Sequence, residues 1–289
     1  MTKVLRNSLI NGIASDYLNI NDRAIHYGDG LFETILCDNN QLYYWQQHFL
    51  RLQKSAEKLQ IICPQEDVLL GDIKKLRDEN EAVFESSCVI KIIISRGGSQ
   101  RGYQIPKKEN VNRIVLLSNL DKNYSSLLSE KLFSGELYLC EQQVSINKNL
   151  AGIKHLNRLE NVLARNEWQS DYIDGLMLNA NQNVIEGTMS NLFAVKNNQL
   201  FTPELSLSGV NGIMRDVIIE VAHENSVKIS ITNSTLEDVK NMDALFISNS
   251  LIGIKAVSKF GTFFYENHPL INNIFEKLLN EKEGHVYSI

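Results

Sequence analysis

The chain has 289 residues, of which 43% are hydrophobic and 22% charged. This length is enough for about two domains with a sizeable core. The formal net charge is -5 and the basic residues are scattered, so nothing in the sequence attracts nucleic acid. No apolar run approaches the roughly 18 residues of a membrane span. We therefore expect neither nucleic acid nor a membrane as a partner.

The four cysteines and six histidines do not form a metal-binding pattern. Cys37, Cys63, Cys88 and Cys140 lie far apart, and no C-x-x-C spacing occurs. We therefore expect no metal site and reduced thiols, as in a cytosolic protein. The N-terminus M-T-K-V-L-R-N-S-L-I-N-G lacks the long apolar segment of a secretion signal. The expected location is the cytoplasm.

The first third of the chain predicts strands that alternate with helices. The expected elements are a hairpin over residues 4–20, a second hairpin from 31–37 to 42–45, a helix over 46–61, a helical segment over 64–86 and a buried strand over 88–95. The glycine-rich stretch R-G-G-S-Q-R-G-Y-Q-I-P follows that strand. It lacks G-x-G-x-x-G and does not start a helix, which excludes a dinucleotide-binding loop.

This stretch instead indicates a mobile, cationic substrate loop. Arg96 and Arg101 flank its glycines, and Tyr103 adds a hydroxyl group. A surface loop without function stays open as the alternative. After a strand over 113–118, the polar residues 119–134 suggest a domain connection. We place an N-terminal domain at residues 1–120 and a C-terminal domain at 121–289, with the boundary uncertain by about ten residues.

The stretch from Ala151 to Glu167 predicts an amphipathic helix, because Leu156, Leu159 and Leu163 recur at helical spacing with Val162 beside them. Lys154 lies just before this stripe. Most such lysines are surface residues. However, a lysine held against apolar side chains loses its proton more easily, and it then becomes the nucleophile that a Schiff base requires.

The rest of the chain predicts a strand over 135–144, an antiparallel meander after the central helix, a strand over 244–249 and a terminal helix over 270–279. Glu186 ends one strand of the meander. Gly209 to Arg215 opens a further helix. Glycines ahead of a helix leave backbone N–H groups pointing outward, so Ile213 and Met214 offer a site for an anion.

Six separated segments resemble the fold-type IV enzymes that use pyridoxal 5′-phosphate. These segments are Asp22–Thr34, His48–Leu59, Ser95–Pro106, Ala151–Glu160, Glu186–Phe193 and Gly209–Arg215. The resemblance implies an α/β fold with α+β character. It has a smaller N-terminal α/β domain and a larger C-terminal domain rich in antiparallel strands, with the cofactor between them. Homodimers are usual in this family.

The resemblance also implies a role for each matching residue. Lys154 would form the Schiff base and act as general base and acid, Arg51 would bind the cofactor phosphate, and Glu186 would pair with the pyridine nitrogen. The other cofactor-binding residues implied are Asn191, Ile213, Met214, Asn249 and Ser250. The substrate-binding residues implied are Arg101, Tyr103 and Phe32, and whether Arg101 and Tyr103 serve their own subunit or the partner stays open.

The lysine segment I-K-H-L-N-R-L-E most resembles the aminodeoxychorismate lyase branch. The helix opening G-V-N-G-I-M-R supports this branch, and I-S-N-S-L-I-G-I-K-A-V lacks the E-x-T-P-V typical of branched-chain and D-amino acid aminotransferases. The activity implied is conversion of 4-amino-4-deoxychorismate to 4-aminobenzoate and pyruvate, a step of folate synthesis. A D-amino acid or branched-chain aminotransferase and a non-catalytic carrier of the cofactor stay open as alternatives.

Overall fold

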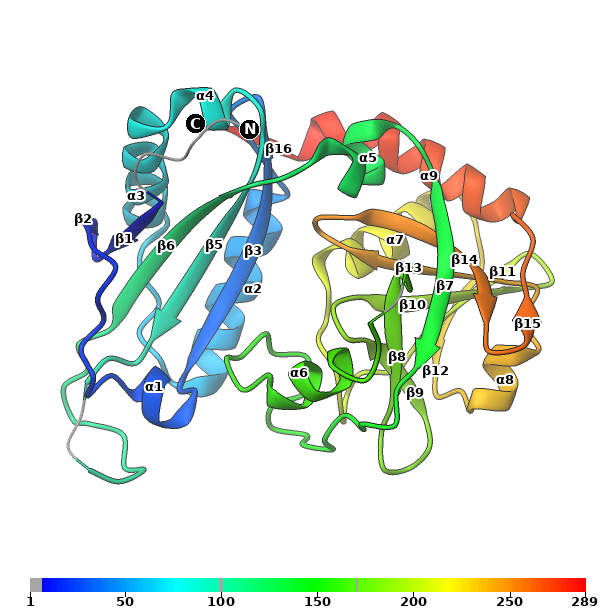
Figure 1. Ribbon diagram of the computed structural model, residues 1–289, viewed down its shortest axis with the longest axis horizontal. Coiled ribbons are helices and arrows are strands. Elements are labelled where there is room, and N and C mark those ends of the chain that lie inside the picture. Colours follow the sequence, from blue (N-terminus) through cyan, green and yellow to red (C-terminus); the bar gives the residue numbers. More distant parts are fainter. Residues whose placement is uncertain (1–6, 99–100, 170) are drawn as a thin grey trace. The chain divides into compact units, whose positions relative to one another are not determined.

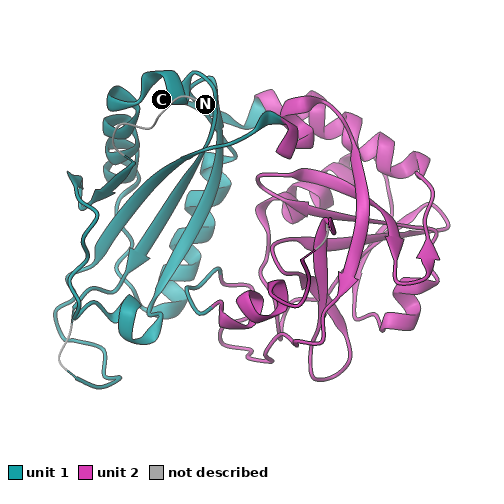
Figure 2. Ribbon diagram, viewed as in Figure 1, with its two compact units in different colours: residues 1–122, 154–157, 284–289 teal, residues 123–153, 158–283 magenta. Residues whose placement is uncertain are grey.

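The computed structural model describes residues 7–98, 101–169 and 171–289. It divides into two compact units, which Figure 2 shows in different colours. Unit 1 comprises residues 1–122, 154–157 and 284–289, and unit 2 comprises residues 123–153 and 158–283. A single cut near residue 120 therefore omits two short returns of the chain to unit 1. Residues 4–6 of the expected first hairpin and Ser99-Gln100 of the expected loop lie outside the described residues.

Unit 1 is built on one antiparallel sheet with the strand order β16-β4-β3-β5-β6-β1-β2 (Figure 1). Its strands are β1 (Ser8–Ile10), β2 (Ile13–Ala14), β3 (Gly30–Asp38), β4 (Gln41–Tyr43), β5 (Ser87–Ser95), β6 (Asn112–Asn119) and β16 (Val286–Ser288). Its helices are α1 (Arg23–Tyr27), α2 (Trp45–Leu59), α3 (Glu66–Glu79) and α4 (Glu81–Phe84). Alternate residues of β5, such as Ile90, Ile92 and Ile94, are buried. This alternation is what a strand with one face on a core requires.

The first half of β3 is paired by the lysine segment. β4 pairs only with the end of β3, at Cys37 and Asp38. Phe32 N–H donates to the carbonyl of Lys154, and Leu156 N–H donates to the carbonyl of Gly30, both at 3.0 Å. Because the backbone groups of a buried strand need partners, this edge holds residues 154–156 in an extended conformation.

Unit 2 contains a larger, mixed sheet. Its strands are β7 (Phe133–Leu139), β8 (Asp174–Leu178), β9 (Val184–Gly187), β10 (Asn191–Lys196), β11 (Gln199–Pro203), β12 (Ile229–Thr232), β13 (Ala244–Asn249), β14 (Gly253–Phe260) and β15 (Phe263–Phe264). Its helices are α5 (Ser126–Ser129), α6 (Leu159–Arg165), α7 (Ile213–Glu224), α8 (Leu236–Lys240) and α9 (Pro269–Glu281). Short 3₁₀ helices, Lys122–Tyr124 and Lys282–His285, lie where the chain passes between the units.

Six strands of unit 2 form a closed ring. The pairings run β10-β13-β14-β7-β8-β9 and then return to β10. The closing contact between β9 and β10 is a single residue pair, Glu186 with Asn191. The N–H of Gly187 also donates to the carbonyl of Ser190 at 2.7 Å. The tight turn after Glu186 is therefore the point at which the ring closes.

Most elements lie within a few residues of their predicted positions, and the α/β class with a C-terminal unit rich in antiparallel strands is confirmed. Two predicted elements are shorter or broken. The strand expected over residues 135–144 ends at Leu139, and the helical segment over 64–86 is interrupted at Asn80, between α3 and α4. No helix in the described ranges is both long and apolar enough to cross a membrane.

The central segment differs most from its prediction. Its leucine spacing predicts one helix over residues 151–167, but α6 begins only at Leu159. Pairing with β3 keeps residues 154–156 extended, so a tertiary contact overrides the local pattern. The stripe also does not pack inward, because Leu159, Val162 and Leu163 are 71%, 61% and 51% exposed. The prediction of a buried leucine face on this helix is wrong.

The contact at Gly30 gives a test of the pairing between β3 and the lysine segment. A Cβ atom at Gly30 would lie 2.4 Å from the Ile94 carbonyl oxygen and 2.7 Å from Cδ1 of Leu156. We expect Gly30→Ala to lower the free energy of unfolding by about 1–3 kcal/mol, because overpacking forces β5 or Leu156 to move. Urea unfolding followed by circular dichroism measures this change.

Gly71→Ala is the matched control. Gly71 lies inside α3, and a Cβ atom there would meet nothing within 4 Å. Alanine in a helix interior is more stable than glycine by about 0.5–1 kcal/mol, so this variant should be slightly more stable than the native protein. Equal effects of the two substitutions would contradict the close packing described at Gly30.

Candidate active site

Lys154 and Phe32, two of the predicted site residues, lie together in unit 1. The Nζ atom of Lys154 is 4.2 Å from the centre of the Phe32 ring. Lys91 of β5 places its own Nζ atom 5.2 Å from the same ring. The aromatic face attracts a cation without fixing a hydrogen-bond direction. The backbone pairing with β3 thus carries Lys154 to a half-buried aromatic surface.

Next to Phe32, the buried carboxylate of Glu33 contacts two side chains of α2. Its Oε2 atom is 2.6 Å from Nδ1 of His48. Arg51 donates from Nε to Oε1 at 2.8 Å and from Nη2 to Oε2 at 2.5 Å. His48 and Arg51 are three residues apart, which places them on one face of the helix. Arg51, expected to bind phosphate, is therefore held in a fixed orientation by a two-point contact.

These contacts determine the charges of the cluster. Burial raises the pKa of Glu33, but Arg51 and His48 outweigh burial and hold that pKa at about 2. Burial lowers the pKa of His48, and the nearby cations of Arg51 and Lys154 lower it further, against the opposing effect of Glu33. At neutral pH Glu33 is therefore ionised and His48 is neutral. The Nε2 atom of His48 is buried and has no hydrogen-bond partner among the described residues.

In unit 2, Glu186 and Asn191 both contact the backbone of Val210. The Val210 N–H donates to Oε2 of Glu186 at 2.8 Å, and Nδ2 of Asn191 donates to the Val210 carbonyl at 2.9 Å. Glu186 is 4% exposed. Arg158 lies near it: burial lowers the pKa of Arg158, while the carboxylates of Glu186 and Glu160 oppose that shift. Glu186 is thus a buried carboxylate in a defined position.

A second buried carboxylate, Asp174 of β8, holds the turn between Glu186 and Asn191. It accepts hydrogen bonds from Gly175 N–H (2.7 Å), Thr188 N–H (3.0 Å), Thr188 Oγ1 (2.5 Å), Met189 N–H (3.2 Å) and Ser190 Oγ (2.6 Å). A Cβ atom at Gly187 would lie 2.4 Å from Oδ2 of Asp174, so glycine is required for this close approach. Asp174 therefore fixes the segment that carries both predicted cofactor-binding residues.

The N-terminus of α7 meets the same segment. Gly212 is the N-cap and provides no side chain, so Ile213 and Met214 begin the helix without a side-chain cap. Oδ1 of Asn191 lies 2.0 Å from where a Cβ atom of Gly212 would be. Ser248 pairs with Asn191 across the sheet, and its buried hydroxyl has no hydrogen-bond partner among the described residues. A helix start and an unpaired buried hydroxyl together suit an anion.

Asn249 and Ser250, also predicted to bind the cofactor, follow β13. Oδ1 of Asn249 accepts from the N–H groups of Leu251 and Ile252, both at 2.9 Å, and its Nδ2 donates to the Met189 carbonyl at 3.1 Å. Asn249 thus closes the turn into β14, and Ser250 lies within that turn. The neighbouring Ser248 has a hydroxyl that suits a ligand, and the cofactor contacts of Asn249 and Ser250 stay predictions.

The predicted cationic loop is only partly as expected. Arg96 is 3% exposed and its guanidinium binds Asp29 and Glu109 at 2.8 and 2.5 Å. The prediction that Arg96 contributes to a mobile, cationic substrate loop is therefore wrong, because its side chain is buried and its charge is neutralised inside unit 1. Arg101 and Tyr103, by contrast, are exposed.

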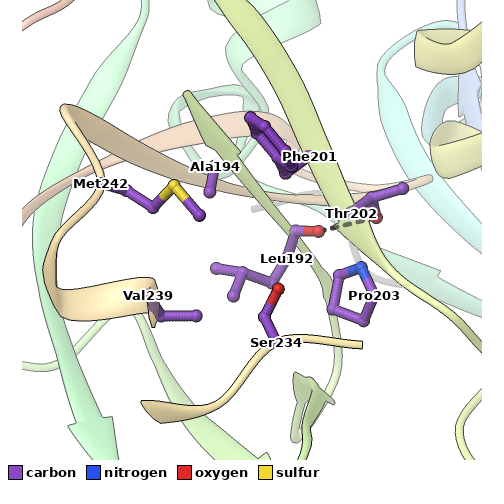
Figure 3. A pocket seen from close by; sticks show the side chains of 8 residues that line it. All are labelled: Leu192, Ala194, Phe201, Thr202, Pro203, Ser234, Val239 and Met242. Carbon is purple, nitrogen blue, oxygen red and sulfur yellow. Dashed lines mark hydrogen bonds between the residues drawn. The ribbon is translucent and has the colours of Figure 1, made fainter. Parts of the chain in front are cut away.

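A small pocket in unit 2 lies outside this set of residues. It is lined by Leu192, Ala194, Phe201, Thr202, Pro203, Ser234, Val239 and Met242 (Figure 3). The hydroxyl of Thr202 donates to the Leu192 carbonyl at 2.9 Å, as the dashed line in the figure shows. The lining is mostly apolar and includes none of the predicted site residues. We therefore assign this pocket no part in the reaction.

Comparison with known proteins decides the family. Residues 30–260 match the model of the family described as amino-transferase class IV. The chain belongs to this family. An aminodeoxychorismate lyase of Vibrio harveyi is 36% identical over 86% of this chain and 89% of its own length. A D-alanine aminotransferase of Listeria monocytogenes is 26% identical over 89% and 86%, respectively.

A solved structure gives the same result for the fold of this class IV chain. The 4-amino-4-deoxychorismate lyase of Pseudomonas aeruginosa superimposes with a TM-score of 0.85 and 29% identity, over 95% of this chain and 98% of its own. The family is one of pyridoxal 5′-phosphate-dependent enzymes of fold type IV, so this protein is an enzyme with that cofactor. The fold and the cofactor implied by the sequence motifs are confirmed.

Each unit, taken by itself, holds groups of the kinds that suit this cofactor, which carries an aldehyde, a phosphate and a pyridine nitrogen. Unit 1 supplies an amine in Lys154 and a guanidinium in Arg51. Unit 2 supplies the buried carboxylate of Glu186, the N-terminus of α7 and the unpaired buried hydroxyl of Ser248. An amine, a carboxylate and an anion site are the three kinds of group that such a molecule requires.

Sequence reasoning assigned no role to Glu33, His48 or Asp174. A signal for Glu33 exists in L-F-E-T-I-L, where an acidic residue interrupts an apolar strand, and the H-x-x-R of α2 supplies matching partners at helical spacing. Asp174 has no comparable signal. Four of its five hydrogen bonds come from the turn at residues 188–190, which reaches it only through the fold.

The low pKa of Glu33 predicts a loss of stability in acid. In the unfolded chain this carboxyl has its ordinary pKa of 4.5, whereas in the folded protein the value is about 2. The contribution is therefore complete above about pH 4.5 and is lost as the pH falls toward 2. Between pH 7 and pH 3 the native protein should lose about 2 kcal/mol more unfolding free energy than Glu33→Gln, which has no charge to lose.

Urea unfolding at pH 7, 5, 4 and 3 for both proteins measures this difference. Glu33→Gln will be less stable at pH 7, because it leaves Arg51 and His48 without their buried carboxylate. Only the slope against pH tests the linkage. Parallel pH profiles for the two proteins would show that Glu33 does not titrate with a depressed pKa.

Proposed function

We propose that the protein is an aminodeoxychorismate lyase, which converts 4-amino-4-deoxychorismate to 4-aminobenzoate and pyruvate. The observation that carries this proposal is the 36% identity with the Vibrio harveyi lyase, against 26% with the Listeria aminotransferase over a similar length. The segments K-H-L-N-R-L-E-N and G-V-N-G-I-M-R and the absence of E-x-T-P-V support the same branch. The homodimer expected from the family stays a prediction.

In this proposal, the Lys154 amine acts as the general base. When bound, pyridoxal phosphate draws electrons from the substrate carbon that carries the amino nitrogen. Nζ of Lys154 takes the proton from that carbon, and the C–O bond to the neighbouring enolpyruvyl group breaks. The leaving enolpyruvate takes up a proton to become pyruvate. The remaining ring becomes aromatic, which drives the loss.

The other proposed roles follow from how each side chain is held. Arg51, oriented by Glu33, would bind phosphate from unit 1, and the N-terminus of α7 with Ser248 would bind it from unit 2. Glu186 would pair with the ring nitrogen and keep it protonated. Because Val210 N–H and the turn held by Asp174 fix Glu186 before any ligand arrives, its charge needs no rearrangement during the reaction. The substrate has two carboxylates, which we assign to Arg101 and Tyr103.

A D-amino acid or branched-chain aminotransferase is the second candidate. The similarity to D-alanine aminotransferases over 89% of the chain favours it. Such an enzyme changes the visible absorbance of its cofactor when an amino acid is added alone, and it releases a keto acid. A lyase needs aminodeoxychorismate for turnover. Adding D-alanine, L-leucine or aminodeoxychorismate separately therefore distinguishes the two activities.

Purified protein given aminodeoxychorismate should release 4-aminobenzoate and pyruvate in equal amounts. Lys154→Ala should release neither and should lack the visible absorbance of lysine-bound cofactor, because no other amine takes the proton. Fluorescence of 4-aminobenzoate and an enzymatic pyruvate assay measure the two products. Lys91→Ala is the control, since Lys91 contacts the same Phe32 ring and should not be needed for turnover. Product release by Lys154→Ala would overturn the assignment of the base.

Glu186→Gln should keep the cofactor bound but reduce kcat by roughly 100-fold, as expected for loss of a preorganised electrostatic partner. Steady-state kinetics and the absorbance spectrum measure the two effects separately. Glu167→Gln is the matched control, because Glu167 accepts hydrogen bonds from the backbone of residues 141 and 142 and has no proposed role. An unchanged kcat in Glu186→Gln would mean that another group interacts with the ring nitrogen.

A further inference from the structure

Residues 101–104 carry two of the proposed substrate-binding side chains but form neither a helix nor a strand. Arg101 is exposed, and Tyr103 is 84% exposed. Within the part of the chain that the structure describes, these four residues make no backbone-to-backbone hydrogen bond. Side chains from elsewhere in the fold contact this backbone instead.

The guanidinium of Arg23 contacts the carbonyl groups of three successive residues in this segment. Nη1 donates to the carbonyl oxygens of Gly102 at 3.1 Å and Gln104 at 3.4 Å, and Nη2 donates to that of Tyr103 at 3.2 Å. Arg23 lies in α1 and is 4% exposed. One buried cation thus donates hydrogen bonds to three carbonyl groups. Hydrogen bonds from a charged donor are stronger than those between neutral groups.

Arg23 is itself held in place. Its Nε atom donates to Oδ2 of Asp29 at 2.7 Å, and the same carboxylate oxygen accepts from Nε of Arg96 at 2.8 Å. With Nε bound to Asp29, the two terminal nitrogens are directed at the loop. A lysine could not make both sets of contacts, because an ammonium group is compact and lacks the planar fork of a guanidinium.

Tyr27, at the end of α1, supports the same residues. Its hydroxyl accepts a hydrogen bond from Gly102 N–H at 3.3 Å, and its ring centre lies 5.1 Å from that of Tyr103. The Cζ atom of Arg23 lies 4.9 Å from the Tyr27 ring centre. Two side chains of α1 therefore hydrogen-bond to Gly102, which lies between Arg101 and Tyr103: Arg23 binds its carbonyl and Tyr27 binds its N–H.

We propose that Arg23 is a positioning residue for substrate recognition: it fixes the backbone of residues 102–104 and thereby places Arg101 and Tyr103 against the substrate carboxylates. This proposal rests on the proposed function for the role of those two side chains. The anchoring itself is a property of the protein without substrate. The two parts can therefore be tested separately.

The first readout needs no activity. Chymotrypsin cleaves after exposed tyrosines when the local backbone can open, so the rate of cleavage after Tyr103 in the native holoenzyme reports anchoring. We expect Arg23→Lys to raise this rate about 10-fold and Tyr27→Phe, which loses one hydrogen bond, to raise it less. Arg113→Lys is the matched control, because Arg113 binds Asp72 at 2.6 Å in the same unit and makes no described contact with residues 101–104.

The second readout is kinetic. Arg23→Lys should raise the KM for aminodeoxychorismate on the order of 10-fold to 100-fold, because misplacing a binding group weakens substrate positioning, while kcat and the cofactor absorbance change little. Arg101→Ala should also raise KM. Adding Arg23→Lys to the variant that lacks both side chains, Arg101→Ala with Tyr103→Ala, should leave KM unchanged, since Arg23 acts through side chains that are already missing.

Each outcome has a definite meaning. Unchanged cleavage after Tyr103 in both Arg23→Lys and Tyr27→Phe would overturn the anchoring. Faster cleavage with an unchanged KM, or a further rise in KM when Arg23→Lys is added to Arg101→Ala with Tyr103→Ala, would overturn the link to substrate recognition. If the native enzyme turns over an amino acid instead, the lyase proposal fails, and the same KM comparison on that amino acid tests Arg23 independently.

Discussion

The structure depends on the pairing of the lysine segment with the open edge of β3. Two backbone hydrogen bonds between residues 154–156 and β3 replace the helix that the local sequence favours. They also bring Lys154 to Phe32. Lys154 lies near the cluster of Glu33, His48 and Arg51, and its charge helps to lower the pKa of His48. β4 is short and pairs only with Cys37 and Asp38 at the far end of β3. The first half of the same edge of β3 therefore stays open for the lysine segment. Backbone pairing thus fixes the position of the main chain at Lys154.

This constraint explains what the sequence could and could not predict. Strands such as β5 and helices such as α2 were predictable because their apolar periods reflect a single buried face. The central segment was not, since its leucines satisfy a helical period while the edge of β3 imposes an extended backbone. The exposed leucines of α6 show the same limit: a period identifies an apolar face, but it does not identify what covers that face.

The site shows a similar division. Motifs located Lys154, Arg51 and Glu186, which face the cofactor in the proposed reaction, because chemistry restricts the residue types there. They did not locate the groups that hold these side chains, such as Glu33 for Arg51 and Asp174 for the turn after Glu186. A holding residue needs only the right distance from its partner, and this distance arises when segments far apart in sequence meet. Arg23 is of this kind, since its three acceptors lie about eighty residues later.

Unit 2 places Glu186 where its ring of strands is least supported by backbone pairing. β9 and β10 share one residue pair, so the ordinary ladder contributes little to closing the ring. The four hydrogen bonds from residues 188–190 to Asp174 and the contacts of Glu186 and Asn191 with Val210 add polar connections there. The fold therefore exchanges regular pairing for directed polar contacts at Glu186, the position where the proposed function places a fixed, buried carboxylate.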